Sequence, residues 1–313
     1  MKYLEDHLRE RVDSKLKELQ KLRPLSPEQV AKLREQFAIE MTYNSNAIEG
    51  NKLTLKETYL IINEGITIKG KSLKDHLEAK DHYEALNYLY ELIEHGKRAT
   101  FSEILIRNLQ QLVIKDTEPK EAGVYRKGNV IITGSSHRPP DAFEVPILMK
   151  DLLEWIRVNK NKLHPIELAT IVHHKLVFIH PFFDGNGRTA RLVMNLLLMQ
   201  KGYPLIVILK NDRKKYYDSL EKADKGNYIQ FVRFIAQAVE RSINLYLKTL
   251  VGAKDSKGKF MLLSVIAKTT PYSEKYLNLL CRQGKIEAYK EGRNWLTSFE
   301  AVKTYQDNRE RKR

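Results

Sequence analysis

The sequence has almost no cysteine and no long apolar run. Cys281 is the only cysteine in 313 residues, which excludes an intrachain disulfide and a metal site built from several cysteines. No apolar stretch approaches the roughly 20 residues that a membrane-spanning helix needs. The first residues, "MKYLEDHLRERVDSKLKELQKLRP", are charged and lack the apolar core of a signal peptide. We therefore expect a cytoplasmic protein with no membrane partner.

Acidic residues are also scarce relative to basic ones. The chain has 39 aspartates and glutamates against 54 lysines and arginines, a net charge of +15. From Lys254 onward there are 14 basic residues against 7 acidic ones, so the excess is concentrated near the end. A basic balance favours polyanionic partners such as nucleotides, nucleic acid or acidic protein surfaces.

Apolar residues recur at helical spacing through most of the chain, which predicts an all-α fold. The predicted helices lie within residues 26–50, 75–97, 101–115, 145–162, 165–179, 188–202 and 228–251. Two stretches differ. "GVYRKGNVIITGSSHRPPDAFEVP" places Val130, Ile131 and Ile132 between glycines, which predicts a short β-hairpin flap. After the polar linker "GAKDSKGK", the pattern of helix, turn, helix and two short strands predicts a small winged helix-turn-helix module.

One stretch, "HPFFDGNGRTAR" from His180 to Arg191, gathers the residue types of a phosphate-handling site. Gly185 and Gly187 let the backbone turn and approach a ligand closely. They precede the expected helix start near Arg188, and the first turn of a helix offers free N–H groups to phosphate oxygens. The two arginines are three residues apart, so they share a helix face and can clamp one anion.

The same stretch supplies a carboxylate and a base. Mg²⁺ is commonly held by one or two carboxylates together with substrate phosphates, so Asp184 suffices. A neutral His180 can accept a proton from a hydroxyl nucleophile. The alternative is a polar turn between helices, because Asp, Gly and Asn are common turn residues. A zinc site that adds His173 and His174 is a further alternative, although adjacent histidines point in different directions on a helix, which favours packing.

The stretch resembles the motif of the Fic family: histidine, any residue, phenylalanine, any residue, aspartate or glutamate, then Gly-Asn-Gly-Arg, two residues of any kind and arginine. Every defined position matches, and the similarity extends over roughly residues 42 to 250. Fic proteins are helical bundles that mostly transfer AMP from ATP to a protein hydroxyl. The resemblance thus implies an ATP- and Mg²⁺-dependent adenylyltransferase that modifies a target protein, and in some cases itself.

The resemblance also implies roles for the motif residues. His180 would deprotonate the target hydroxyl, and Asp184 would bind Mg²⁺. The amides of the glycine loop, with Asn186, would hold the α- and β-phosphates, and the two arginines would neutralise the phosphate tail. The related Doc kinases carry a lysine near the second glycine, so Gly187 favours AMP transfer. The expected nucleotide-binding residues are Gly185, Asn186, Gly187, Arg188, Thr189, Ala190 and Arg191.

Two other segments acquire a role by the same resemblance. The flap residues Val130, Ile131, Ile132 and Thr133 would pair with the backbone of the target protein, the alternative being an ordinary surface hairpin. In "DRKKYYDSLEKADKGN", Tyr217 and Asp224 would contact the nucleoside, whereas Tyr216 equally suits the core.

The upstream stretch "SNAIEGN" matches the family's inhibitory pattern of serine or threonine, three residues, then glutamate. Ser45 and Glu49 are four residues apart and share a helix face, and Gly50 would end that helix. The resemblance implies that Glu49 pairs with an arginine that otherwise meets the γ-phosphate, and we expect Arg191 to be that arginine. A second implied role for Glu49 is positioning a water that removes AMP from a modified protein. A plain helix end is the alternative.

We expect three parts: a helical region over residues 1–95 with the inhibitory helix at about 42–50, the catalytic core over 96–251, and the winged module over 258–313. In that module Ser273–Cys281 would form the recognition helix, with Tyr276, Asn278 and Arg282 facing DNA and Arg293 on the wing. A module for dimerisation or target binding is the alternative. The competing function is a DNA-binding regulator whose Fic body only senses nucleotide; relatives also suggest a homodimer.

Overall fold

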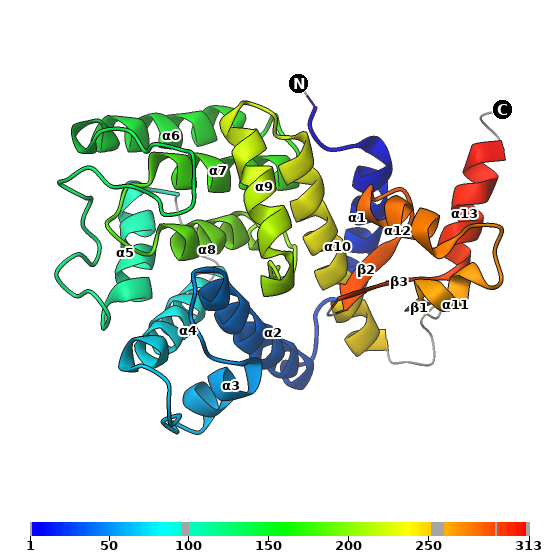
Figure 1. Cartoon of the computed structure of the whole chain (residues 1–313), viewed down its shortest axis with the longest axis horizontal. Helices are drawn as coiled ribbons and strands as arrows, with labels where there is room; N and C mark the ends of the chain where they lie inside the picture. Colours follow the sequence, from blue (N-terminus) through cyan, green and yellow to red (C-terminus); the bar gives the residue numbers. More distant parts are fainter. Residues whose placement is uncertain (1, 95–100, 252–259, 292, 311–313) are drawn as a thin grey trace.

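The chain folds into a helical body followed by a small winged module (Figure 1). The structure is a computed structural model, and it describes residues 2–94, 101–251, 260–291 and 293–310. No helix within these ranges is long and apolar enough to cross a membrane. The expected domain boundaries at 95–96 and 252–258 lie outside the described residues.

The body confirms the predicted all-α fold, including each of the seven helices expected from apolar spacing. Its helices are α1 (Asp6–Lys21), α2 (Pro27–Ile48), α3 (Leu55–Asn63), α4 (Leu73–Glu94), α5 (Glu103–Ile114), α6 (Val145–Asn159), α7 (Pro165–Ile179), α8 (Asn186–Met199), α9 (Arg213–Asp224) and α10 (Ile229–Val251). Two 3-10 turns, η1 (Ala142–Glu144) and η2 (Lys210–Asp212), precede α6 and α9.

Polar residues fix where several helices begin. Ser26 caps α2: its hydroxyl accepts a hydrogen bond from the Gln29 N–H, and the Gln29 side chain accepts one from the Ser26 N–H. Thr54 and Glu57 form the same reciprocal arrangement at the start of α3. Such capping boxes satisfy N–H groups that have no partner inside the helix. One capping box fixes the start of α2, the helix that ends at Glu49, and the other fixes the start of α3, the helix that follows.

The central helices are α7 and α8, which pack against each other. Every residue from 188 to 198 in α8 is buried, as expected for a helix enclosed on all sides. The helices α6, α9 and α10 pack against α7, whereas α2, α4 and α5 pack against α8. Figure 1 shows the start of α8 among these helices. The motif that begins α8 is therefore held by the best-packed part of the protein.

The segment between α5 and α6 is not the predicted β-hairpin. Residues 128–140 contain no strand; they form an extended loop with a turn in which the Ser135 N–H donates to the Ile132 carbonyl at 3.2 Å. The segment pairs near its base, through an isolated bridge between Tyr125 and Phe182. A lone two-stranded ribbon is at best marginally stable, and the prolines at 139 and 140 remove backbone donors. These features explain why no ladder forms.

The winged module has the predicted helix, turn, helix and two strands. Its elements are β1 (Met261–Leu262), α11 (Leu263–Ala267), α12 (Glu274–Arg282), β2 (Ala288–Glu291), β3 (Asn294–Thr297) and α13 (Phe299–Glu310). The antiparallel sheet has the order β1-β3-β2, with Met261 opposite Thr297 and Lys290 opposite Trp295. The sequence did not predict β1 or α13. A strand of two residues, such as β1, is too short to show an alternating pattern, and α13 is largely polar.

The winged module is docked on the body through polar contacts. The Arg11 guanidinium of α1 donates to the Gly284 carbonyl at 2.8 Å. The Gln237 amide of α10 donates to the Cys281 carbonyl at 3.0 Å. On the wing, Lys290 pairs with Asp212 of η2 at 2.5 Å. These contacts hold the module beside α1 and α10, as Figure 1 shows.

Candidate active site

The candidate site is the loop that joins α7 to α8. His180 ends α7 in the left-handed conformation, with φ 50° and ψ 58°, and it is the one non-glycine residue with positive φ within the described ranges. Such a conformation is strained for a residue with a side chain. Gly185, with φ 80°, then turns the chain into α8. His180 and the first turn of α8 therefore lie at the two ends of one short loop.

The loop is braced from inside by the side chain of Asn186. Its side chain accepts a hydrogen bond from the Phe182 N–H at 3.0 Å and donates one to the Phe182 carbonyl at 2.8 Å. Both polar atoms of the Asn186 amide therefore bond within the loop, and its contact with a phosphate stays a prediction. Gln110 of α5 adds a second brace, donating to the Asp184 carbonyl at 3.0 Å and accepting from the Gly123 N–H at 2.6 Å.

His180 is a neutral imidazole at physiological pH. Desolvation, with a smaller contribution from the positive charge of Arg126, lowers its pKa to about 4. The Nδ1 atom lies 3.3 Å from the Val177 carbonyl, and a carbonyl only accepts, so Nδ1 carries the proton. The Nε2 atom is then the unprotonated nitrogen. This arrangement makes His180 a base rather than a cation.

Arg126 connects the flap to this histidine, a contact that no local pattern predicts. Its Nε donates to the His180 carbonyl at 2.8 Å, and its Nη1 donates to the Gly128 carbonyl at 3.1 Å. Its side chain is buried. At the base of the flap, Asn129 donates to Asp141 at 2.6 Å. Arg126 therefore holds the strained turn at His180 and the start of the flap together.

Asp184 is the accessible carboxylate of the loop. Its Oδ1 accepts from the Gly185 N–H at 2.6 Å, and its Oδ2 lies 3.2 Å from Arg188 Nη2. About a third of the side chain, 36%, is exposed. The described residues contain no cluster of three or more metal-ligating side chains, so a bound Mg²⁺ would need oxygens from the nucleotide as well. That is the usual way in which proteins hold Mg²⁺ with a nucleotide.

Arg188 and Arg191 are buried with unsatisfied donors. Their side chains are only 2% and 1% exposed. Neither Nε nor Nη1 of Arg188, nor Nη1 of Arg191, has a hydrogen-bond partner among the described residues. Buried donors without partners are costly, particularly on a charged group. Two guanidiniums with free N–H groups beside Asp184 therefore fit a phosphate chain with its Mg²⁺.

The structure brings Glu49 to Arg191, as the sequence predicted. Glu49 ends α2, and its Oε1 accepts from Arg191 Nη2 at 2.7 Å. Ser45 binds the same guanidinium: its hydroxyl accepts from Nε and its carbonyl from Nη2, each at 2.9 Å. Burial alone would lower the pKa of Arg191, but the charge of Glu49 raises it above its ordinary value. The guanidinium is thus engaged by the end of α2.

Gly187 lies directly beneath this pair. A Cβ atom built on Gly187 would overlap Oε1 of Glu49 and would lie 3.2 Å from Nη1 of Arg191. A larger residue at this position would therefore have to displace the Glu49 carboxylate, which lies against the backbone of the loop. A carboxylate at this place mimics the anion that the first turn of a helix attracts.

Four other expected residues have mixed outcomes. Thr189 and Ala190 are fully buried, with Ala190 inside the main core cluster. Their contact with a nucleotide therefore stays a prediction. Tyr217 is 37% exposed, with the Arg213 guanidinium 4.7 Å from its ring centre. Asp224 is turned to α7, where it bonds His174 Nε2 at 2.9 Å.

The two adjacent histidines of α7 pack inside the body. His173 Nε2 and the Tyr216 hydroxyl are 3.0 Å apart, and both residues are buried. His174 Nδ1 lies 3.0 Å from the Tyr228 hydroxyl. Both rings also contact aromatic neighbours edge-on. The core reading of Tyr216 is confirmed.

The flap residues are accessible. Ile131 is 74% exposed, and Thr133 is exposed, whereas Val130 and Ile132 are partly covered. His137 fixes the far side of the segment, since its Nε2 lies 2.8 Å from the Phe178 carbonyl. The segment therefore lies beside His180 with backbone available, although not in the predicted hairpin.

Only some of the residues that we expected to face DNA are exposed on the winged module. Arg282 and Arg293 are exposed, and Asn278 is partly exposed. Tyr276 instead turns inward, with its hydroxyl 3.1 Å from that of Tyr305 and its ring against the module core. The predicted recognition helix does coincide with α12.

Comparison with known proteins assigns the chain to a family. A family model described as Fic/DOC family matches residues 100–198. A Fic domain containing signaling protein from Bacteroides thetaiotaomicron is 31% identical, with a TM-score of 0.71 over 79% of this chain and 97% of that one. The chain belongs to the Fic/DOC family. A Fic family protein from Desulfovibrio desulfuricans G20, 25% identical with a TM-score of 0.65, covers 94% of this chain and 96% of its own.

Several relatives carry a functional name. "Protein adenylyltransferase Fic" from Nematostella vectensis is 37% identical over 249 residues, which are 79% of this chain and 57% of that protein. The protein of the same name from Aedes aegypti is 40% identical over 211 residues, 67% of this chain and 42% of that protein. This chain therefore spans about half the length of these relatives. The range that the family model matches includes the motif from His180 to Arg191.

Proposed function

We propose that this Fic protein transfers AMP from ATP to a hydroxyl side chain of a target protein. The observation that carries the proposal is the pairing of a neutral, partly buried His180 with two buried arginines that have unsatisfied N–H groups. The arginines suit a phosphate chain, and the imidazole suits a hydroxyl nucleophile. The names of the relatives support the same reaction.

In this proposal His180 is the general base. With Nδ1 protonated against the Val177 carbonyl, Nε2 takes the proton from the acceptor hydroxyl of a serine, threonine or tyrosine. The hydroxyl oxygen then forms a bond to the α-phosphorus of ATP, and the bond from that phosphorus to the bridging oxygen breaks. Pyrophosphate leaves, and AMP remains on the target. Because the pKa of His180 is lowered to about 4, the base is available throughout the neutral range.

The phosphate chain is held by the start of α8. Arg188 and Arg191 neutralise its charge through N–H groups that are otherwise unsatisfied, and the free N–H groups of the first turn add further donors. Mg²⁺ held by Asp184 and the phosphates would offset the negative charge that the leaving pyrophosphate develops. Tyr217, partly exposed near Glu49 and Arg191, is our candidate for a nucleoside contact, and Asp224 is a weaker one.

Glu49 keeps this site inactive in the proposal. It occupies one face of the Arg191 guanidinium at 2.7 Å and lies against Gly187. A γ-phosphate that needs the same guanidinium must displace a carboxylate of the same charge. The resting protein is therefore self-inhibited, and release of Glu49 activates it.

The target protein is proposed to dock on the flap. Residues 130–133 lie on the chain that Arg126 ties to the His180 carbonyl. An extended target segment that adds itself to this loop as a strand would be aligned by backbone hydrogen bonds. Its acceptor side chain would then point to His180.

Transfer of labelled ATP tests the proposal. Purified protein is incubated with Mg²⁺, a cell lysate as acceptor, and ATP labelled on either the α- or the γ-phosphate. We expect Glu49→Gly to transfer the α-label strongly and the γ-label not at all, and addition of His180→Ala to abolish transfer. Transfer of the γ-label would indicate a kinase, and α-label transfer that survives His180→Ala would rule out the proposed base.

A further inference from the structure

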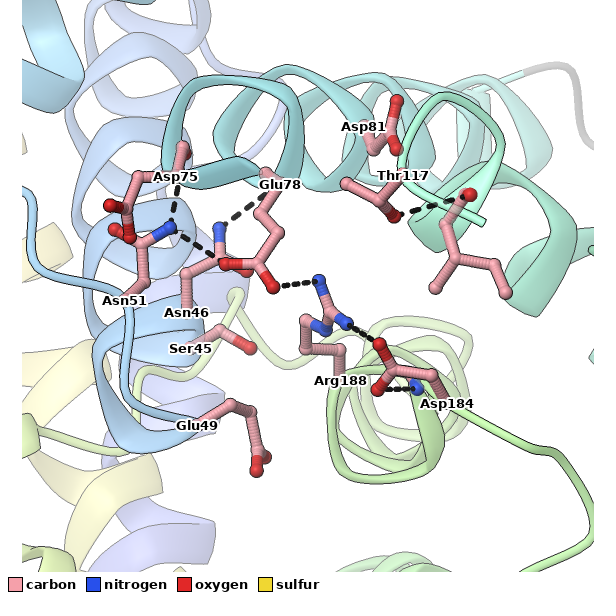
Figure 2. Close-up of polar contacts among 12 residues, drawn as sticks. Ser45, Asn46, Glu49, Asn51, Asp75, Glu78, Asp81, Thr117, Asp184 and Arg188 are labelled. Carbon is pink, nitrogen blue, oxygen red and sulfur yellow. Dashed lines mark hydrogen bonds and ion pairs between the residues drawn. The ribbon is translucent and has the colours of Figure 1, made fainter. Parts of the chain in front are cut away.

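Arg188 lies between two carboxylates that come from different parts of the chain. Its Nη2 is 3.2 Å from Asp184 in the motif loop, and its Nη1 is 3.6 Å from Oε1 of Glu78 in α4. Figure 2 shows the two carboxylates on opposite sides of the guanidinium. Glu78 has no place in the motif. Its side chain is only 13% exposed.

Glu78 is itself held by the inhibitory stretch, residues 45–51, at the end of α2. The Asn51 amide donates to Oε2 of Glu78 at 2.8 Å and to the Asp75 carbonyl at 3.0 Å. The Asn46 amide donates to the Glu78 carbonyl at 3.2 Å. Figure 2 shows this chain of contacts running from Asn51 through Glu78 to Arg188 and Asp184. Both asparagines of "SNAIEGN" thus support a residue that contacts Arg188, the first motif arginine.

We propose that Glu78 is a positioning residue of the nucleotide site, which holds Arg188 away from full pairing with Asp184 and so leaves the Asp184 carboxylate able to bind Mg²⁺. The inference rests on the proposed function only in requiring that ATP and Mg²⁺ bind here. Glu78 acts through Arg188 and touches neither the nucleotide nor the metal.

The charges of the three groups explain the effect. One guanidinium between two carboxylates leaves one net negative charge, which attracts a cation. Without the charge of Glu78, Arg188 has a single carboxylate to pair with, and a guanidinium forms two parallel hydrogen bonds to one carboxylate readily. Asp184 would then be neutralised by Arg188. Its oxygens would be less available to Mg²⁺, which binds hard, charged oxygen ligands.

The geometry agrees with a shared guanidinium. The contact to Asp184 uses one nitrogen at 3.2 Å, which is longer than the 2.7–2.9 Å typical of a charge-assisted hydrogen bond. The Asp184 Oδ1 atom accepts only from the adjacent Gly185 N–H among the described residues. Arg188 is therefore not seated on Asp184, and one carboxylate oxygen faces the loop.

Metal-dependent binding of ATP tests the inference without any need for transfer. Glu49→Gly serves as the background, so that the nucleotide site is open. Titration calorimetry measures ATP binding once without divalent metal and once at increasing Mg²⁺. Glu78→Gln keeps the shape of the side chain and removes its charge. Partners that orient a metal ligand from behind commonly change metal affinity by tenfold or more, so we expect the Mg²⁺ concentration for half-saturation to rise about tenfold.

Comparing ATP binding with and without Mg²⁺ shows whether Glu78 acts through the metal or through the local fold. Glu78→Gln removes a carboxylate from the phosphate site, so ATP without metal should bind no more weakly than in the background. Weaker binding in both titrations would show that Glu78 only maintains the local fold and would overturn the proposal. An unchanged Mg²⁺ requirement would overturn it as well.

Two further variants keep the test decisive. Glu78→Asp retains the charge on a shorter side chain and should require less Mg²⁺ than Glu78→Gln. Glu84→Gln removes another ion-paired carboxylate of α4, one that pairs with Lys115, and should behave as the background does. An equal effect of Glu84→Gln would refute the specific role of Glu78.

The outcomes also separate this inference from the proposed function. If Glu49→Gly binds ATP with Mg²⁺ but transfers no AMP, the proposed function fails and the Glu78 titrations still decide the inference. If the Glu49→Gly protein binds no ATP with Mg²⁺, both are wrong.

Discussion

Replacing Glu49 by alanine should destabilise the protein without nucleotide and increase its stabilisation by ATP with Mg²⁺. The Glu49 carboxylate accepts from Arg191 at 2.7 Å, with side-chain exposures of 33% for Glu49 and 1% for Arg191. A hydrogen bond to a charged group contributes about 1.5–3 kcal/mol. The lower end applies, since a third of the Glu49 side chain is exposed to water, which screens the pair.

The position of Glu49 in α2 reduces the expected loss. It occupies the C-terminal cap of α2, where no basic residue lies in the last turn. A negative charge at that end of a helix is unfavourable by about 0.3–1 kcal/mol. The net loss for Glu49→Ala is therefore about 1 kcal/mol. For a chain of this size the melting temperature should fall by about 2 °C.

With ATP and Mg²⁺ bound, the Glu49→Ala variant should become more stable than wild type. If release of Arg191 improves the affinity for ATP with Mg²⁺ about tenfold, saturating nucleotide adds about 1.4 kcal/mol to the stability of the variant relative to wild type. Differential scanning fluorimetry with and without nucleotide measures both effects. Alanine is used because glycine would add a backbone entropy cost of about 0.5–1 kcal/mol in the last helical turn.

Glu64 supplies a matched control. It occupies the C-terminal cap of α3 and precedes Gly65, just as Glu49 precedes Gly50, and it is exposed. Glu64→Ala should leave the melting temperature unchanged or slightly raised, because only the unfavourable helix-end charge is lost. If Glu49→Ala behaves like Glu64→Ala with and without nucleotide, the Glu49–Arg191 pair neither stabilises the resting state nor restricts ATP.

Three other outcomes follow from the contacts. Gly187→Ala should lower the melting temperature of wild type more than that of Glu49→Gly, because the added Cβ overlaps the Glu49 carboxylate; equal losses in both backgrounds would contradict the overlap. The His180 pKa of about 4 predicts that protonation of the base does not slow transfer near pH 6.5. The contribution of neutral His180 to stability should be lost only as pH falls from about 6.5 towards 4. NMR titration of its ring protons checks this, and a midpoint near 6.5 would contradict it. Asp212→Asn weakens the partly buried pair with Lys290 and should increase hydrogen exchange in β2 while the rest of the body keeps its protection.

The sequence predicted the parts of the site that are contiguous in the chain. The motif sets its own geometry: Gly185 turns the backbone, and the buried start of α8 presents Arg188 and Arg191. The pairing of Glu49 with Arg191 was predicted across 142 positions from the resemblance, together with the shared helix face of Ser45 and Glu49. These features depend on local spacing, which a sequence displays directly.

The residues that the sequence missed act over long separations through single contacts. Arg126 reaches the His180 carbonyl, Gln110 reaches the Asp184 carbonyl, and Glu78 reaches Arg188. A lone polar residue at a helical position has no local pattern that distinguishes it from a solvated one. The bracing role of Asn186 was missed for the same reason, since its hydrogen bonds to Phe182 depend on the tertiary turn.

The predicted hairpin failed on different grounds. Val130, Ile131 and Ile132 have high strand propensity, but propensity expresses how well side chains pack on neighbouring strands. Neither half of the segment meets a strand partner within the described residues. The same residues form strand-like extended backbone only if a partner supplies the second edge. A bound target segment would provide such an edge.

The initial rate of AMP transfer by wild type and by Glu49→Gly, measured on the same target with Mg²⁺ and with ATP well below saturation, tests the central claim most directly. A contact worth about 1–2 kcal/mol predicts that the variant is about five- to thirtyfold faster. Both rates should vanish when His180→Ala is added. Equal rates for wild type and Glu49→Gly would contradict inhibition by Glu49, and transfer without His180 would contradict the assigned base.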